Sequence, residues 1–408
     1  MNVTKILLTA VLPLLTAAAQ AEGDTLRYEI ELSGNASDGK YAPLWFTANR
    51  YGLSSERPNS GYTRAGVEYG RSLGRRWRID AGLDLAAGIG QNAPFIVQQA
   101  YADVTWSVLT LSMGSKERGS FPLEKDMRLS AGTMVEGPNA RPVPQVRLEM
   151  KRYWDLPLTR GWLAVKGHIG YGVLTDGRWR KNFTAVGNSY TKNAVYHTKS
   201  LMLRVGNTEK FPLTMEIGML EAAQFGGSKW RNNADGTSTC TENMPNGIKD
   251  FFKAFIPKQK STLENIEGNH VGSWNFALNY TAPTWKARLY YEHFFDDHSQ
   301  LTWQYGRWKD GHIGVELTVP KNPVVSKVLW EGLCTTDQTG PILYDGVGGS
   351  FNDLQMSGRD NYYEHATYPW THWGQNMGMP FVTGPAYGGD GRLTFVSNRV
   401  KAHHIGVS

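Results

Sequence analysis

Residues 77–86 read WRIDAGLDLA, and apolar and polar side chains alternate along this stretch. Trp77, Ile79 and Leu83 occupy one set of positions, and Asp80 and Asp84 occupy the other. Successive side chains of a β-strand point to opposite faces, so a period of two predicts a strand with one apolar and one polar face. A single strand of this kind fits a soluble sandwich as well as a membrane barrel.

The same alternation returns along most of the chain. Further copies cover residues 26–33, 146–150, 213–219, 274–280, 285–291 and 313–319. We count about sixteen candidate strands, close in length to the roughly 9 to 11 residues that a tilted membrane-spanning strand needs. Beyond residue 21 no stretch approaches the roughly 18 consecutive apolar residues of a spanning helix, and mean hydropathy is −0.42, which excludes a helical membrane protein.

The connections between these segments alternate between short and long. Short connections cover residues 207–212, 281–284 and 320–325, and long ones cover residues 175–195, 222–270, 295–310 and 335–392. This parity requires residues 100–116 to form two strands joined by a tight turn near Ser107. Outer-membrane barrels have short periplasmic turns and long outer loops. The sequence therefore predicts an all-β, transmembrane antiparallel β-barrel of a Gram-negative outer membrane.

The two ends of the chain suggest further boundaries. Residues 1–21 combine Lys5, an apolar run and the small residues Ala19 and Ala21, the pattern of a secretory signal peptide cleaved near Ala21. Residues 22–408 are expected to form the barrel. The final HIGV, residues 404–407, repeats residues 312–315, which open a strand. Since a barrel must close to satisfy its edges, we expect this chain to be incomplete at its C-terminus.

Four segments resemble the capsule-assembly Wzi family of outer-membrane proteins. They are YEIELSGNAS (28–37), APLWFTANRY (42–51), LSAGTMVEGPNARPVPQVRL (129–148) and GRDNYYEHATYPWTHWGQNMGMPF (358–381). The resemblance spans the mature chain, and the order of the segments is more specific than any one of them. The helical elements described for relatives are not clear here, where only residues 121–127 and 244–266 have weak helical potential.

The resemblance implies a barrel of about eighteen strands, about sixteen of them present here, that acts as a lectin-like protein in attaching capsular polysaccharide to the cell surface. The expected partners are capsular or exopolysaccharide, outer-membrane lipid or lipopolysaccharide, and polysaccharide export machinery, with no nucleic acid. An outer-membrane porin or carbohydrate channel is the alternative. An outer-membrane lipid hydrolase is a third, more distant class, for which Ser350 or Ser357 could pair with His365.

One aromatic loop contains the candidate polysaccharide-binding residues. They are Asp360, Asn361, Tyr362, Tyr363, His365, Trp370 and Trp373. Flat aromatic faces can stack on sugar rings, and planar polar groups can share hydrogen bonds with hydroxyls. The structural alternative is that these side chains fold the loop onto itself or fill the lumen, because a long loop must bury something to stay ordered.

The net charge and the reactive side chains give less information about the function than the aromatic loop does. The net charge is +6, and basic residues are expected on the lumen side at Arg147, Lys151, Lys166, Arg204, Lys286 and Arg288. This field would favour an acidic ligand, but opposed acidic and basic ladders are also structural in porins, and we favour that reading. We find no HExxH, nucleophile elbow or Walker loop, and expect no enzyme, metal or cofactor. Cys240 and Cys334 could form a disulfide in an oxidising compartment.

Overall fold

The computed structural model describes residues 8–21, 24–255, 268–296, 310–338 and 361–408. Strands dominate it. They are β1 (Leu8–Ala21), β2 (Asp24–Ala36), β3 (Asn59–Leu73), β4 (Trp77–Ile89), β5 (Phe95–Trp106), β6 (Leu109–Ser115), β7 (Gln145–Met150), β8 (Trp154–Asp155), β9 (Leu163–Val173), β10 (Ser189–Lys192), β11 (Val195–Val205), β12 (Leu213–Phe225), β13 (Ser228–Asn232), β14 (Ser238–Asn243), β15 (Asn269–Thr281), β16 (Lys286–Phe295), β17 (Gly311–Thr318), β18 (Lys327–Cys334), β19 (Thr371–His372), β20 (Gln375–Asn376) and β21 (Lys401–Val407). The helices are α1 (Leu44–Thr47), α2 (Gly177–Phe183), α3 (Ile248–Phe255) and the 3-10 helix η2 (Pro385–Tyr387). No helix in these ranges is long and apolar enough to cross a membrane.

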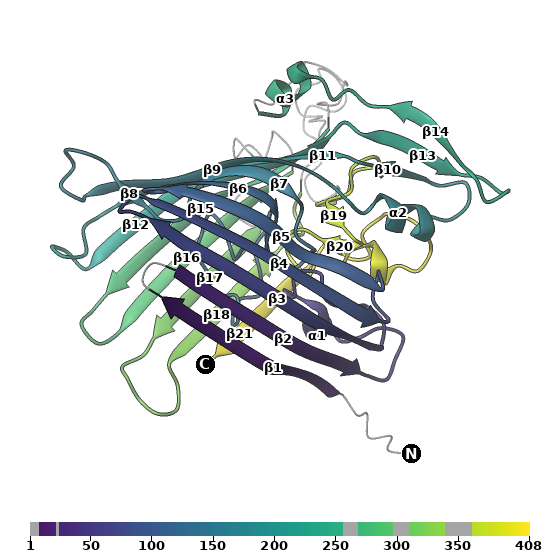
Figure 1. Ribbon diagram of the computed structural model, residues 1–408. Helices are drawn as coiled ribbons and strands as arrows, with labels where there is room; N and C mark the ends of the chain where they lie inside the picture. The colour runs from purple at the N-terminus through teal and green to yellow at the C-terminus, as the bar shows by residue number, and fades with distance from the viewer. Residues whose placement is uncertain (1–7, 22–23, 256–267, 297–309, 339–360) are drawn as a thin grey trace, which may run out of the picture.

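Sixteen strands form one sheet, in which neighbours along the chain pair antiparallel from β1 to β21. Figure 1 shows this sheet curving into a wall around an interior. Within the described residues, β1 and β21 are the two edges and do not pair with each other. The structure places residues 8–21 in β1, paired with β2. Cleavage near Ala21 stays a prediction.

The sheet is apolar on its exposed face and polar on its buried face. In β6 Leu111 is 42% exposed while the next residue, Ser112, is fully buried. In β7 Leu148 is 44% exposed, whereas Arg147 and Glu149 on either side are buried. A soluble sandwich places its apolar face inside, so this inverted pattern is that of a barrel whose outer face contacts lipid. The predicted fold class is confirmed.

The parity holds for most of the connections, although the β4–β5 connection at the long-connection end has only five residues, 90–94, and the connection from β7 to β9 at the other end is longer, residues 151–162. The turn between β5 and β6 consists of two residues, one of which is Ser107 with φ 58°, and it lies at the same end as the other short turns. The long connections, which contain α2, β10, β13, β14 and α3, gather at the opposite end (Figure 1). Exposed aromatics mark the short-turn end, where Trp77 and Trp106 pair across β4 and β5 and Tyr280 lies beside Trp285. Interfacial girdles have this composition.

Several local expectations need correction. Residues 121–127 form no helix but an irregular segment, in which Pro122 and Leu123 are buried in the interior. Residues 244–266 contain the short α3 and extend beyond the described ranges. α2 and the small sheet β10–β13–β14 were not predicted. Cys240 and Cys334 are both free thiols here, so the possible disulfide is not formed.

Candidate functional site

Three segments of the long connections fold into the barrel interior. We call them together the plug, and define it as residues 37–58, 116–144 and 361–400. Plug residues Met134, Trp370 and Met379 join a buried apolar cluster with Tyr196 of β11 and Phe294 of β16. Polar strand faces surround this cluster, so the interior is filled by a small core that the chain supplies itself.

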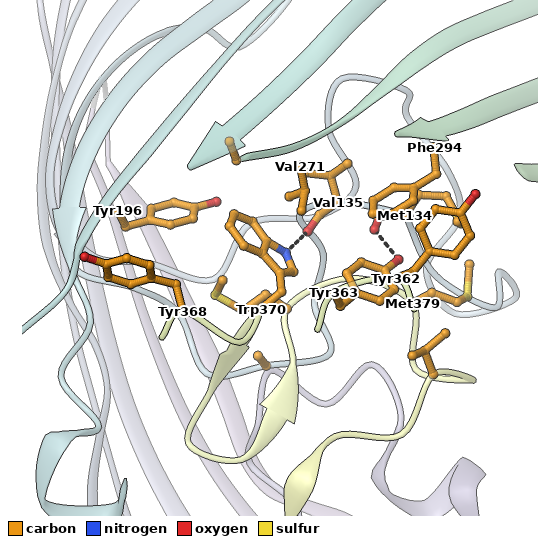
Figure 2. Packing of buried hydrophobic residues seen from close by; sticks show 14 of the residues in the cluster. Met134, Val135, Tyr196, Val271, Phe294, Tyr362, Tyr363, Tyr368, Trp370 and Met379 are labelled. Carbon is orange, nitrogen blue, oxygen red and sulfur yellow. Dashed lines mark hydrogen bonds between the residues drawn. The ribbon is translucent and has the colours of Figure 1, made fainter. Parts of the chain in front are cut away.

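Two hydrogen bonds fix the centre of the plug (Figure 2). The indole Nε1 of Trp370 donates to the Val135 carbonyl oxygen at 2.9 Å, and the hydroxyl of Tyr363 donates to the Met134 carbonyl oxygen at 2.5 Å. Each bond joins residues more than 200 positions apart in the sequence. Buried N–H and O–H groups need such partners, so the bonds hold the aromatic loop in one arrangement on residues 134–135.

The first plug segment packs on the same scaffold. The side-chain amide of Asn49 donates to the carbonyl oxygens of Ser130 and Ala131, and Asn139 donates to the carbonyl oxygen of Asn376. Gly52 has φ +65°, and a Cβ there would lie 2.4 Å from the backbone nitrogen of Arg141. A side chain at Gly52 would therefore force the segments apart. Three of the segments that resemble the Wzi family, residues 42–51, 129–148 and 358–381, thus contact one another in the plug.

A buried polar network ties the plug to the wall. Glu331 of β18 accepts hydrogen bonds from Ser130 Oγ at 2.7 Å and from the Ala131 backbone N–H at 2.5 Å. Lys125 Nζ lies 2.7 Å from Glu292 and 2.9 Å from His312 Nδ1. Such pairing offsets the cost of burying these charges and fixes the position of the plug against β16, β17 and β18.

The structure separates the predicted site residues. Tyr362, Tyr363 and Trp370 are at most 1% exposed, so a sugar cannot reach their rings without opening the cluster. The position of these three side chains is that of the structural alternative, in which the aromatic residues fold the loop onto itself and fill the lumen. His365 is partly buried, and its Nδ1 accepts from the backbone N–H groups of Thr367 and Tyr368.

The remaining predicted residues lie nearer the surface. Asn361 is partly exposed, donates to Glu364 and accepts from Arg399 Nε. Asp360 lies outside the described residues, as do Ser350 and Ser357. Trp373 is partly exposed at the tip of the β19–β20 hairpin, and it is the one predicted aromatic platform that keeps part of its surface accessible.

Trp373 stacks on a residue that sequence reasoning missed. The guanidinium carbon of Arg141 lies 4.1 Å from the centroid of the Trp373 ring, a cation–π distance. Arg141 lies in NARPVPQ (residues 139–145), part of the Wzi-like segment 129–148. The resemblance drew attention to this segment but did not indicate a role for Arg141. Burial lowers the pKa of Arg141 to about 10, which leaves the side chain cationic at neutral pH.

A second arginine, Arg180, contacts the backbone of the hairpin that carries Trp373. Arg180 of α2 donates to Asp176 at 2.8 Å and to the carbonyl oxygen of Thr371 at 2.8 Å. Asp176 also accepts from the backbone N–H of Trp373 at 3.0 Å. Burial lowers the pKa of His372 to about 4, so His372 is neutral near pH 7. The group of Arg141, Arg180, Asp176 and His372 therefore carries one net positive charge.

The expected lumen charges are mostly paired. Arg147 lies 2.8 Å from both Glu136 and Glu149, and Lys166 lies 2.8 Å from Glu124. The opposed ladders thus hold the plug and wall together. A cavity of about 550 Å³ opens at the short-turn end, and its lining includes Arg204, Lys286, Arg288, Asp155 and Glu216. Within the described ranges no three His, Cys, Asp or Glu side chains gather to hold a metal ion.

Comparison with known proteins identifies a fold. No family model matches the sequence, and no curated protein matches it. Among solved structures, the chain is similar to Wzi, an outer membrane protein involved in group 1 capsule assembly in Escherichia coli and a carbohydrate-binding β-barrel, with 14% identity and a TM-score of 0.50. The match covers 86% of this chain and 63% of that one, so this chain spans less than two thirds of the length of Wzi.

Porins are matched more distantly. Salmonella typhi OmpF in complex with daunomycin is 9% identical with a TM-score of 0.31, over 77% of this chain and 92% of that one. A mutant Rh. blastica porin is 11% identical with a TM-score of 0.28, over 68% of this chain and 87% of that one. At these levels of identity, the likeness to Wzi concerns the fold alone.

Proposed function

We propose that this protein is a lectin-like outer-membrane barrel that holds capsular polysaccharide at the cell surface and has no enzymatic activity. The observation that carries the proposal is the plug, whose centre is the buried contact of Trp370 and Tyr363 with residues 134–135. A transport barrel needs a continuous wet path, whereas a surface-binding barrel needs a rigid platform for its outer loops. The four quoted segments and the Wzi-like fold support the same assignment.

A porin or carbohydrate channel is the second candidate. The observation that favours it is the cavity of about 550 Å³ at the short-turn end, which has a mixed charged lining. In a channel this cavity would continue past the plug to the outer end. The buried cluster around Trp370 fills the interior between this cavity and the outer end. A solute could therefore pass through the barrel only if the plug moved.

Deletion of the gene in an encapsulated host tests the proposal. We expect the total polysaccharide made by the culture to stay unchanged, while most of it passes from the cell-bound fraction to the medium. Return of the wild-type gene on a plasmid should restore the bound fraction. Capsule that stays cell-bound at normal density in the deletion strain would show that the protein does not attach it.

A further inference from the structure

Three arginines are buried among the described residues, and they differ in their partners. Arg147 is paired with Glu136 and Glu149, and Arg180 is paired with Asp176. Arg141 is 6% exposed, and no hydrogen bond or ion pair to its guanidinium is found in the described part of the chain. A buried cation without a hydrogen-bonded anion is costly, so this side chain is set up for a partner that comes from outside.

The indole of Trp373 shows the same feature. Its Nε1 is buried and has no hydrogen-bond acceptor within the described residues, although the ring itself is partly exposed. Arg141 Nε is likewise buried without an acceptor. Two hydrogen-bond donors therefore remain unsatisfied on a stacked cation–aromatic pair, and both need an acceptor rather than a donor.

The turn that carries Trp373 has an unusual backbone conformation. Trp373 and Gly374 are the two central residues of the β19–β20 hairpin, with φ 54° and 81°. A two-residue turn with both φ values positive strongly prefers Asn-Gly, because bulky side chains are strained in the left-handed region. Gly374 fits this requirement and Trp373 does not.

The surroundings select the charge of the ligand. Asp176 acts electrostatically on Arg141, but it is already engaged by Arg180 and by the Trp373 backbone. His372 donates from Nδ1 to the Arg141 carbonyl oxygen at 2.7 Å and is neutral near pH 7. The net positive charge near Arg141 is therefore left for an anion. A planar guanidinium binds a carboxylate through two parallel hydrogen bonds, and an indole face packs on a sugar ring.

We propose that Arg141 and Trp373 bind a carboxylate-bearing sugar residue, so that the retained polymer is an acidic polysaccharide. This inference rests on the proposed function and specifies its ligand. Arg141 would take the carboxylate, and Trp373 would pack the exposed part of its ring on the sugar ring. Asn92, which donates to the Trp373 carbonyl oxygen at 2.9 Å, fixes the hairpin tip from the β4–β5 loop.

Isothermal titration calorimetry of the purified full-length protein with trigalacturonate tests this site. The methyl ester of the same trimer is the matched neutral probe, since it keeps the rings and removes the charges. We expect the wild type to bind the acid at least tenfold more tightly than the ester. Arg141→Gln should remove that preference, and Arg141→Lys should restore part of it.

The control variant is Arg57→Gln, which removes the same charge from an exposed side chain at the end of the first plug segment. It should leave the preference unchanged, and this result would exclude a general effect of net charge. Equal binding of acid and ester, or an unchanged preference in Arg141→Gln, would overturn the inference and leave the attachment role standing. Binding of neither trimer by the wild type would also overturn it, while the capsule-retention experiment judges the proposed function separately.

Discussion

At the residue scale, Trp370 and Trp373 have different roles although they stand three positions apart. Trp370 is fully buried, whereas Trp373 is partly exposed. Trp370→Ala should lower the stability of the plug by about 3–5 kcal/mol, the usual cost of removing a large buried aromatic side chain. Trp373→Ala should cost clearly less. Hydrogen exchange of the β19 and β20 amides measures both, and equal effects would contradict the assignment of Trp370 to the core.

The plug should also respond to pH through His372. Burial lowers its pKa in the folded protein from 6.5 to about 4, so between these values the unfolded chain binds more protons than the folded one. Stability is therefore complete above pH 6.5 and falls as the pH drops toward 4, by on the order of 3 kcal/mol.

Thermal melting of the wild type and of His372→Gln from pH 7.5 to 4.5 checks this dependence. Asp176, Arg141 and Arg180 interact electrostatically with His372, and His365 adds to the dependence, because burial lowers its pKa as well. The change of melting temperature with pH should therefore be smaller in His372→Gln than in the wild type, because the contribution of His372 is lost and that of the other groups remains. Parallel slopes in the two proteins would show that His372 does not titrate in this range.

At the element scale, the strands were predictable and the plug was not. The alternation at residues 77–86 and the turn at Ser107 can be read locally, because strand faces and tight turns are set by neighbouring residues. Trp370 depends on Val135, a partner 235 positions away, and nothing in its own loop indicates which contact it makes. The same holds for the contact of Trp373 with Arg141.

The exposed apolar face of the strands gives a test of membrane embedding. Leu201, near the middle of β11, is 65% exposed. If this face contacts lipid, Leu201→Arg should cost about 2–4 kcal/mol, as arginine does at the midplane of a membrane barrel. Val186, in the loop before β10, is 64% exposed, and Val186→Arg should be nearly neutral. Denaturant unfolding of both variants in lipid vesicles should separate them, and two neutral variants would contradict lipid contact.

At the scale of the whole molecule, the barrel and the plug together define the protein. The wall is apolar outside and charged inside, and the plug satisfies that charge through pairs such as Lys125 with Glu292 and Arg147 with Glu136. The β19–β20 hairpin and the small β10–β13–β14 sheet lie at the long-connection end of the barrel (Figure 1). The periodicity of the sequence predicted the wall, while the arrangement of the plug required the structure.

Single-channel recording of the purified wild-type protein in a planar bilayer tests the plugged barrel most directly. Because Trp370, Tyr363 and residues 134–135 fill the interior, we expect inserted protein to pass almost no current at moderate voltage. Trp370→Ala should open the interior and give measurable conductance, which also shows that the protein has inserted. A large and stable current from the wild type, equal to that of Trp370→Ala, would contradict the plugged barrel and favour a channel.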